Sequence, residues 1–460
     1  MIRTLVLLLA LAPLPALAET ETPPPVGTPK DFALPSVETY SLPNGMGVTL
    51  IPYGSVPKLS ATLQIRTGRL DESVRGLTDL FVALMNEGVG GKSAADVARA
   101  SGDMGGSVGF AGGSDTMSAG ISALSEFAGP AIALLADQVR RPNLPESELP
   151  RLKQDALRGL AVSLQSPQTQ ADMAFANAFY GQHPYGQPVA RAEDLQAISY
   201  AQIRQFFDTQ LGARRAHLYV AGQFDAAAIK QAIARAFGDW QEGPSITLSP
   251  PKLNDALTVR LVGRPNAPQS TLIVGLPMPD ASSPDRIALG VTNELLGGDF
   301  SSRITLSLRE DKGYAYSPDS SYSLRPGFGR WVEVADVTAT NTADSLKVIL
   351  DEIGKLKREA PPEDELDRVK NGLAGSYLFR IASRSGLIGS YAAYDLLGVP
   401  REELGRYVAT MRTVSADDVK RIMNAYFDEK RMTVVIVGDE AQVRTQMSAL
   451  PELSAAIARP

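Results

Sequence analysis

One arginine and one tyrosine in the second half of the sequence are the residues best suited to chemistry. They lie in the segment NELLGGDFSSRITLSLREDKGYAYS, residues 293–317. A guanidinium and a phenol held close together, as Arg309 and Tyr316 would be, suit the binding of a peptide carbonyl or of a developing oxyanion. The pattern by itself also fits a surface arginine beside a partly buried tyrosine, so the chemistry needs support from the elements around it.

The elements that would position this pair can be predicted from the same segment. Ser301 or Ser302 is expected to cap a helix that runs to Lys312, and Gly313 is a natural residue after its end. A strand is then expected to begin at Tyr314. The arginine would lie in the last helical turn and the functional tyrosine in the strand, at one edge of a domain. Tyr314, two residues away on the same strand face, could compete for the role of the phenol.

Composition excludes several other kinds of site. The chain has 460 residues, a formal net charge of −6 and no cysteine, which rules out disulfides, thiol nucleophiles and cysteine-based zinc sites. The mild acidity argues against nucleic-acid binding, which needs a basic surface. The only histidines are His183 and His217, so a histidine-rich metal site within the chain is not expected. His183 is interpreted as structural in a turn and His217 as a packing residue, with no Ser-His-Asp arrangement.

The N-terminus has the pattern of an export signal. Arg3 supplies the positive charge, Leu5–Leu14 the apolar run, and Ala16-Leu17-Ala18 the small residues of a cleavage site. The apolar run is shorter than the roughly 20 residues that span a bilayer. We therefore expect a signal peptide at 1–18, a flexible Pro-rich leader at 19–38, a periplasmic location and no membrane span.

The remaining sequence alternates between strand and helix patterns. Asn44-Gly45 is a strong hairpin signal between two strands, and residues 59–68 form a further strand. Leu77 begins an amphipathic helix with apolar residues at helical spacing up to Met85. Helices are also expected at 94–104, 127–139 and 146–165, and a strand at 117–124. This alternation predicts an α+β fold.

The chain also repeats itself. Residues 198–237 and 413–447 share the order helix, short connection, apolar strand and helix, with Ser199 and Ser415 at equivalent capping positions about 216 residues apart. A repeat of this size indicates domain duplication. We predict an N-terminal domain at 39–241, a polar linker at 242–255, a C-terminal domain at 256–453 and a tail at 454–460. Each domain would be a mostly antiparallel sheet with helices packed on one face.

Two stretches carry a resemblance to a known family. The pattern LGG–SSR–LRE–KGYAYS in residues 296–317, and the stretch Gly181–Phe207 in the first domain, resemble the recurrent motifs of the pitrilysin/insulinase family of zinc metallopeptidases. The resemblance covers nearly all of the chain after the leader and implies the duplicated two-domain fold. It also implies that Arg309 and Tyr316 hold the substrate and stabilise the tetrahedral intermediate across from a zinc ion.

The same resemblance shows where this chain departs from the family. Members carry H-x-x-E-H on an early helix, two zinc-binding histidines with a glutamate that activates water, and a distal glutamate ligand. Here Asp79, Val82 and Ala83 occupy the three motif positions, and the distal region has Gly159 with Asp155 as its nearest carboxylate. No zinc site is expected in this chain.

A glycine-dense stretch, residues 102–116, allows two interpretations. It would form a flexible hairpin, or a backbone surface on which a substrate strand lies close, with Gly112 and Gly113 removing side-chain obstruction.

The leading hypothesis is a subunit without zinc in a heterodimeric periplasmic metallopeptidase. A homologous partner chain would carry H-x-x-E-H and the zinc, an extended peptide would be the substrate, and Arg309 and Tyr316 would act in trans. The chain would be inactive alone. The alternative is a non-catalytic protein of the same fold, either a scaffold like the core subunits of a respiratory complex or a peptide-binding holdase. Cleavage specificity, the physiological substrate and homodimerisation stay open.

Overall fold

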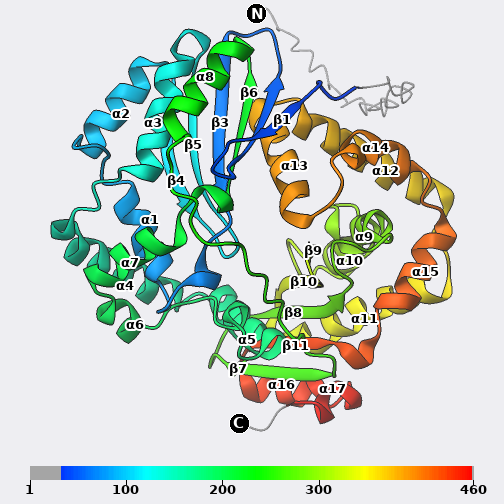
Figure 1. Cartoon of the computed structure of the whole chain (residues 1–460). Helices are drawn as coiled ribbons and strands as arrows, with labels where there is room; N and C mark the ends of the chain where they lie inside the picture. Colours follow the sequence, from blue (N-terminus) through cyan, green and yellow to red (C-terminus); the bar gives the residue numbers. More distant parts are fainter. Residues whose placement is uncertain (1–32, 458–460) are drawn as a thin grey trace, which may run out of the picture. The chain divides into compact units, whose positions relative to one another are not determined.

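A computed structural model describes residues 33–457 of the chain. The predicted signal peptide, and the predicted leader up to residue 32, lie outside the described residues. Residues from Pro35 onward form one compact unit, and within it each half of the sequence builds its own sheet (Figure 1).

The first half builds a six-stranded sheet in the order β1-β2-β6-β3-β5-β4. Only β2 and β6 pair in parallel, and the other neighbours are antiparallel. Side chains of β3 and β5 are buried at every second residue, because one face of the sheet carries the first core. The strands are β1 (Glu38–Ser41), β2 (Gly47–Pro52), β3 (Lys58–Ile65), β4 (Val108–Gly112), β5 (Met117–Leu124) and β6 (Ala216–Gly222).

Helices of the first half confirm the predicted spacing to within a few residues. The expected helix from Leu77 is α1, and its apolar positions face the first core. The helices are α1 (Leu77–Met85), α2 (Ala94–Asp103), α3 (Ala128–Arg140), α4 (Leu149–Ser163), α5 (Pro167–Tyr180), α6 (Ala192–Ala197), α7 (Tyr200–Gln210) and α8 (Ala226–Phe237). Short 3-10 turns are η1 (Arg69–Asp71), η2 (Ser125–Phe127), η3 (Glu146–Glu148), η4 (Pro184–Gly186) and η5 (Ala213–Arg215).

The second half builds a five-stranded sheet in the order β7-β11-β8-β10-β9. Here only β7 and β11 are parallel, and the others are antiparallel. The strands are β7 (Thr258–Gly263), β8 (Gln269–Met278), β9 (Asp319–Arg325), β10 (Phe328–Thr338) and β11 (Thr433–Gly438). This order repeats that of β2, β6, β3, β5 and β4, so the repeat read from the sequence is a repeat of sheet topology.

Helices of the second half pack around a second core. They are α9 (Arg286–Asn293), α10 (Arg303–Thr305), α11 (Thr342–Arg358), α12 (Glu363–Ile381), α13 (Arg384–Leu397), α14 (Glu402–Arg412), α15 (Ala416–Tyr426), α16 (Glu440–Met447) and α17 (Pro451–Ala455). Two π-helical segments, η6 (Glu294–Gly298) and η7 (Leu306–Asp311), flank α10, and 3-10 turns are η8 (Ala339–Asn341) and η9 (Glu429–Arg431).

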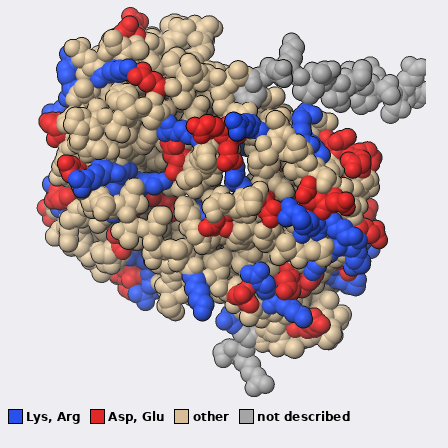
Figure 2. Space-filling view, turned by 45° about the vertical axis from the view of Figure 1, so that its right-hand side comes forward, with Lys and Arg blue, Asp and Glu red and all other residues tan. Residues whose placement is uncertain are grey.

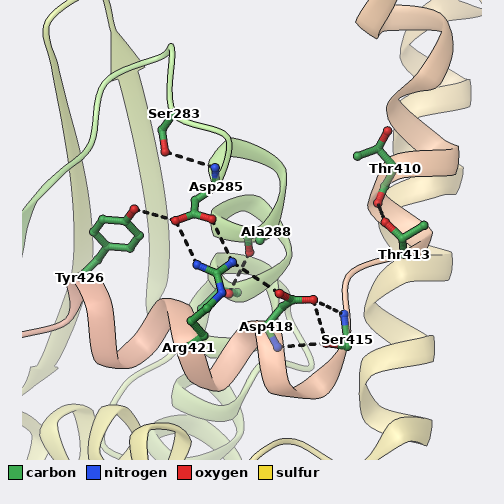
Figure 3. Close-up of polar contacts among 10 residues, drawn as sticks. Ser283, Asp285, Ala288, Thr410, Thr413, Ser415, Asp418, Arg421 and Tyr426 are labelled. Carbon is green, nitrogen blue, oxygen red and sulfur yellow. Dashed lines mark hydrogen bonds and ion pairs between the residues drawn. The ribbon is translucent and has the colours of Figure 1, made fainter.

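The two predicted capping serines cap equivalent helices in the two halves. Ser199 begins α7 and Ser415 begins α15, each in a capping box that binds backbone N–H groups of the first turn. Figure 3 shows Ser415 with its partner Asp418, while Arg421 and Tyr426 of the same helix reach the carboxylate of Asp285 at the start of α9. The cap therefore also orients a helix that ties two parts of the second half together.

One helix from each half packs against the sheet of the other half. α5 packs against β7, β8 and β11, and α13 packs against β6 and β3. Phe175 and Phe179 of α5 meet Ile273, Val435 and Val437 in a separate apolar core. The sequence pattern did not single out α5. The α+β class with two sheets and helices on them is confirmed.

Three sequence-based expectations were wrong in detail. The strand expected at Tyr314 begins at Asp319, and only Ala315 makes an isolated bridge, to Val337. The helix expected up to Lys312 is α-helical only over Arg303–Thr305 and π-helical beyond. The second half also runs past residue 453, because α17 continues and Ile457 pairs with Val259. Within residues 33–457, no helix combines the length and apolarity required to traverse a bilayer.

Candidate functional site

The guanidinium of Arg309 lies over two aromatic rings. Its central carbon is 4.8 Å from the centroid of the Tyr316 ring and 4.2 Å from that of Phe300. The Tyr316 side chain is 78% exposed and Phe300 is 65% exposed, whereas the Arg309 side chain is 24% exposed and pairs through Nε with Glu310 at 3.1 Å. A cation and a phenol are thus presented together at the protein surface.

The π-helical segment η7 determines where Arg309 lies. Leu308 is completely buried in the second core and anchors the turn from which Arg309 emerges. Gly313 then adopts a positive φ of 64°, which glycine tolerates, and the chain reverses toward Tyr316. π-Helical turns are rare and recur at functional sites, so this departure from the predicted regular helix coincides with the candidate residues.

Tyr314 and Tyr316 differ in their surroundings. Tyr314 packs against the second core, its N–H donates to the carbonyl of Leu308 at 2.8 Å, and its carbonyl accepts from the N–H of Thr338 at 2.9 Å. Tyr316, by contrast, is exposed and contacts the guanidinium. The geometry therefore associates Tyr316, and not Tyr314, with Arg309.

Two carboxyl groups, one buried and one partly buried, lie beside Gly297 and Gly298. Glu333 of β10 is 1% exposed, and neither of its oxygens has a hydrogen-bond partner among the described residues. Complete burial, and then Asp319, raise the pKa of Glu333 well above its ordinary value. Burial, and then Asp299 and Asp319, raise the pKa of Glu294 in η6 to about 7. Sequence analysis did not single out either glutamate.

The positions of the early-helix motif lie on α1, where they make other contacts. Asp79 is exposed, and a single oxygen of its carboxylate accepts from Nε and Nη2 of Arg69 at 3.2 and 2.8 Å. Val82 and Ala83 are partly buried and pack against the first core. One face of this helix therefore carries an ion pair and apolar packing.

Gly112 and Gly113 lie at the end of β4, the edge strand of the first sheet. A side chain at Gly112 would meet Cγ2 of Val82 at 2.7 Å. Gly113 donates its N–H to the carbonyl of Thr116 at 2.8 Å and accepts from the N–H of Arg69 at 3.1 Å. Both glycines thus serve contacts within the chain, and their use by a substrate strand stays a prediction.

The two histidines are held in structural roles. Nε2 of His183 lies 2.7 Å from the carbonyl of Ser249. His217 lies in β6 with Nε2 2.7 Å from Oγ1 of Thr49 and its ring stacked on Tyr219 at 4.3 Å. Burial lowers the pKa of His217 to about 4, so it is neutral at physiological pH.

A cavity of about 730 Å³ lies between the two halves. Asp79 and Arg69 line it from the first half, and Arg325 and Arg330 line it from the strands β9 and β10. Asp115 joins its walls, accepting from the hydroxyl of Tyr185 and from Nε of Arg325. Arg309, Phe300 and Tyr316 are not among the residues that line this cavity. The chain therefore brings the arginine and tyrosine together, but does not bring them to the cavity that Asp79 lines.

Comparison with known proteins shows what this chain is similar to. Residues 197–373, which contain Arg309 and Tyr316, match the model described as the peptidase M16 inactive domain. The uncharacterized zinc protease YmxG of Bacillus subtilis is 24% identical over 397 residues, which cover 85% of this chain and 96% of that protein. The crystal structure of a peptidase M16 inactive domain from Pseudomonas fluorescens has a TM-score of 0.82 and 25% identity, covering 88% of this chain and 98% of that one.

The chain is similar to M16 peptidases. A protease from Helicobacter pylori shares the fold at a TM-score of 0.80 and 19% identity, covering 88% of this chain and all of that one. M16 is the family of pitrilysin and insulinase, so the resemblance read from the motifs is confirmed.

The zinc that is typical of M16 peptidases does not fit the residues of this chain. Asp79 is engaged by the Arg69 guanidinium, and the two other motif positions, Val82 and Ala83, have apolar side chains. On α4, which packs against α1, Asp155 pairs with Arg151 and Arg158 of its own helix. Within the part of the chain that the structure describes, no group of three or more histidine or acidic side chains could hold a metal ion.

Surface charge on this protein is mixed. On the face drawn in Figure 2, basic and acidic residues alternate over the surface, and no broad area of a single sign is visible. Phe300 is the residue at the Arg309 site that sequence analysis missed. The only sign of Phe300 in the sequence was that it is an apolar residue before Ser301 and Ser302, in a segment otherwise rich in glycine and polar residues.

Proposed function

We propose that this chain is the subunit without zinc in a heterodimeric, periplasmic zinc metallopeptidase. Its partner would be a homologous chain that carries H-x-x-E-H and the metal, and the substrate an extended peptide. The observation that carries the proposal is the contact between Arg309 and Tyr316 at an exposed surface, in a chain whose own early helix has an ion pair in place of zinc ligands.

The chemistry of the two side chains suits a role in trans. Arg309 would donate from its guanidinium to a substrate carbonyl and fix the peptide across from the partner's catalytic centre. Tyr316 would donate its phenolic proton in a hydrogen bond to the oxyanion that develops as the peptide carbonyl becomes tetrahedral. The partner's zinc would polarise that carbonyl and activate the water.

Two further features support a complementary subunit. Tyr316 is exposed, so a second chain can reach it without rearrangement of this one. The cavity between the halves has Asp79 in its lining but not the pair, so a complete catalytic centre is not assembled inside one chain.

Reconstitution tests the proposal. The chain is co-expressed with an exported homologue that carries H-x-x-E-H, and cleavage of a fluorogenic peptide is followed for each chain alone and for the mixture. We expect chelator-sensitive cleavage from the complex, with the zinc assigned to the partner by metal analysis. Chelator-sensitive cleavage by the isolated chain contradicts the proposal. Recovery of the native protein in a membrane complex without peptidase activity would favour the scaffold alternative.

A further inference from the structure

Phe300 is the second aromatic contact of Arg309 and has no part in the function proposed above. Its ring centroid is 4.2 Å from the guanidinium carbon, closer than that of Tyr316 at 4.8 Å. In the described part of the chain, Arg309 has one ionic partner, Glu310, through Nε, and neither Nη has a hydrogen-bond acceptor. The rings therefore contact the guanidinium while its Nη groups stay available to a ligand.

The backbone at Phe300 is held by the turn around it. Oδ1 of Asp299 accepts from the N–H of Ser301 at 2.8 Å and from the Ser301 hydroxyl, and the N–H of Ser302 donates to the Asp299 carbonyl at 2.9 Å. These hydrogen bonds hold the backbone of the turn, and none of them involves the Phe300 side chain. The exposed position of Phe300 is therefore set by the turn and not by burial of its ring.

The glycines before this turn hold the segment close to the sheet. A Cβ at Gly297 would lie 2.6 Å from Oε2 of Glu333 and 2.6 Å from Oγ of Ser320. Only a residue without a side chain fits at this distance from two buried polar groups. Gly297 therefore lets this segment approach β9 and β10 closely, three residues before Phe300.

Exposure shows that the Phe300 ring contributes little to the core. Phe300 is 65% exposed, and Tyr316, the other ring in contact with Arg309, is 78% exposed. An exposed ring gains little from the hydrophobic effect, whereas contact with a cation is favourable even at exposed sites. The contact with Arg309 is therefore an interaction of the ring that does not depend on burial.

We propose that Phe300 is a positioning residue, which orients the Arg309 guanidinium toward the peptide carbonyl. The inference rests on the proposed function for its consequence in catalysis. An arginine side chain has many rotamers, and ordering them opposes binding. The Phe300 ring restricts those rotamers before substrate arrives, so its loss weakens the alignment of Arg309 while leaving the charge and the phenol in place.

The first experiment uses this chain alone. Arg309 side-chain resonances are followed by NMR in protein labelled on arginine, assigned with Arg309→Lys. Phe300→Leu keeps an apolar side chain and removes the ring. We expect it to abolish the ring-current shift that Phe300 imposes on Arg309, and Phe300→Trp to restore a shift. Phe379→Leu is the matched control, because Phe379 is an exposed ring on α12 (85%). An Arg309 signal unchanged by Phe300→Leu overturns the inference.

The second experiment measures cleavage of the fluorogenic peptide by the reconstituted complex. We expect Phe300→Leu to lower kcat about three- to thirtyfold with KM changed less than about twofold, Phe300→Trp to restore most of kcat, and Phe379→Leu to have no effect. If Tyr316→Phe abolishes turnover and Phe300→Leu does not change it, the positioning role is wrong and the proposed function stands. If Tyr316→Phe also leaves turnover intact, the proposed function itself fails.

Discussion

The Arg69 guanidinium donates two hydrogen bonds to one carboxylate oxygen of Asp79, from Nε at 3.2 Å and from Nη2 at 2.8 Å. Both side chains are partly exposed, at 39% and 53%. By its resemblance to the family, Asp79 matches the first position of the zinc motif, and here its carboxylate is paired with a guanidinium. This relationship leads to a prediction about metal and one about stability.

The isolated chain is expected to retain less than about one tenth of an equivalent of zinc after dialysis. Metal analysis by mass spectrometry measures this. Because exposed ion pairs contribute little, Asp79→Asn is expected to lower the free energy of unfolding by less than about 1 kcal/mol, and Arg69→Gln to have a similar effect. If the isolated chain bound one equivalent of zinc and Asp79→Asn lost it, the conclusion that α1 carries no zinc site would be wrong.

Tyr316→Phe is expected to lower kcat of the reconstituted complex about 10²–10³-fold, because it removes one hydrogen-bond donor to the oxyanion. The matched control is Tyr314→Phe, two residues away, whose ring packs against the second core. Steady-state kinetics with the fluorogenic peptide measures both, and gel filtration confirms that each complex assembles. A large effect of Tyr314→Phe with a small effect of Tyr316→Phe would assign the phenol to the other residue.

Phe179→Ala is expected to lower the free energy of unfolding by about 3–5 kcal/mol. Phe179 is completely buried between the halves, its ring 5.0 Å from those of both Phe175 and Tyr180. Phe379→Ala, at an exposed ring, is expected to change stability by less than about 0.5 kcal/mol. Urea denaturation measures both. A small effect of Phe179→Ala would mean that α5 contributes little to the contact between the halves.

The contribution of Glu294 to stability is expected to fall between about pH 4.5 and pH 7. The pKa of Glu294 is raised to about 7 by burial and by Asp299 and Asp319. The folded state therefore holds this proton more tightly than the unfolded state, so its contribution is fully present below the unfolded pKa and is lost as pH rises to the folded one.

Glu294→Gln tests this assignment because it removes the titrating group. Free energies of unfolding at pH 5 and pH 8 are expected to differ by about 1–2 kcal/mol less in Glu294→Gln than in the unaltered chain, with allowance for the partial exposure of the side chain. Glu310→Gln, at an exposed carboxylate, is the control and is expected to leave the pH dependence as it is. If the pH dependence of the free energy of unfolding were unchanged in Glu294→Gln, Glu294 would not contribute to it.

Much of the fold could be predicted from local patterns. The helix from Leu77 to Met85, the strand from Met117 to Leu124 and the caps at Ser199 and Ser415 all agree with the structure. The caps depend on interactions between residues close in sequence. The helix and the strand each turn one face to the core of their own half, and such a face appears in the sequence as a periodic pattern of apolar residues. The repeat of helix, strand and helix followed from the same signals, whereas the strand order that the two sheets share came from the structure.

The details of the Arg309 site could not be predicted in the same way. Local patterns predicted a regular helix followed by a strand at Tyr314. In the structure, however, η7 is π-helical and β9 begins at Asp319. The reason is tertiary, since Leu308 is buried in the second core and Gly297 lies against Glu333. Packing of this kind changes the hydrogen-bond pattern of a turn without any sign in its apolar period.

The sequence by itself determined which chemistry is possible. With aspartate, valine and alanine at the positions that match the zinc motif and no cysteine, the sequence lacks the family's ligands, and the resemblance to the family singled out Arg309 and Tyr316 as the polar pair. Only the tertiary structure decided that Tyr316, not Tyr314, meets Arg309, that Phe300 contacts the same guanidinium, and that α5 crosses to the other sheet. Residue identity fixes which bonds a side chain can make, whereas its partners depend on how distant segments pack together.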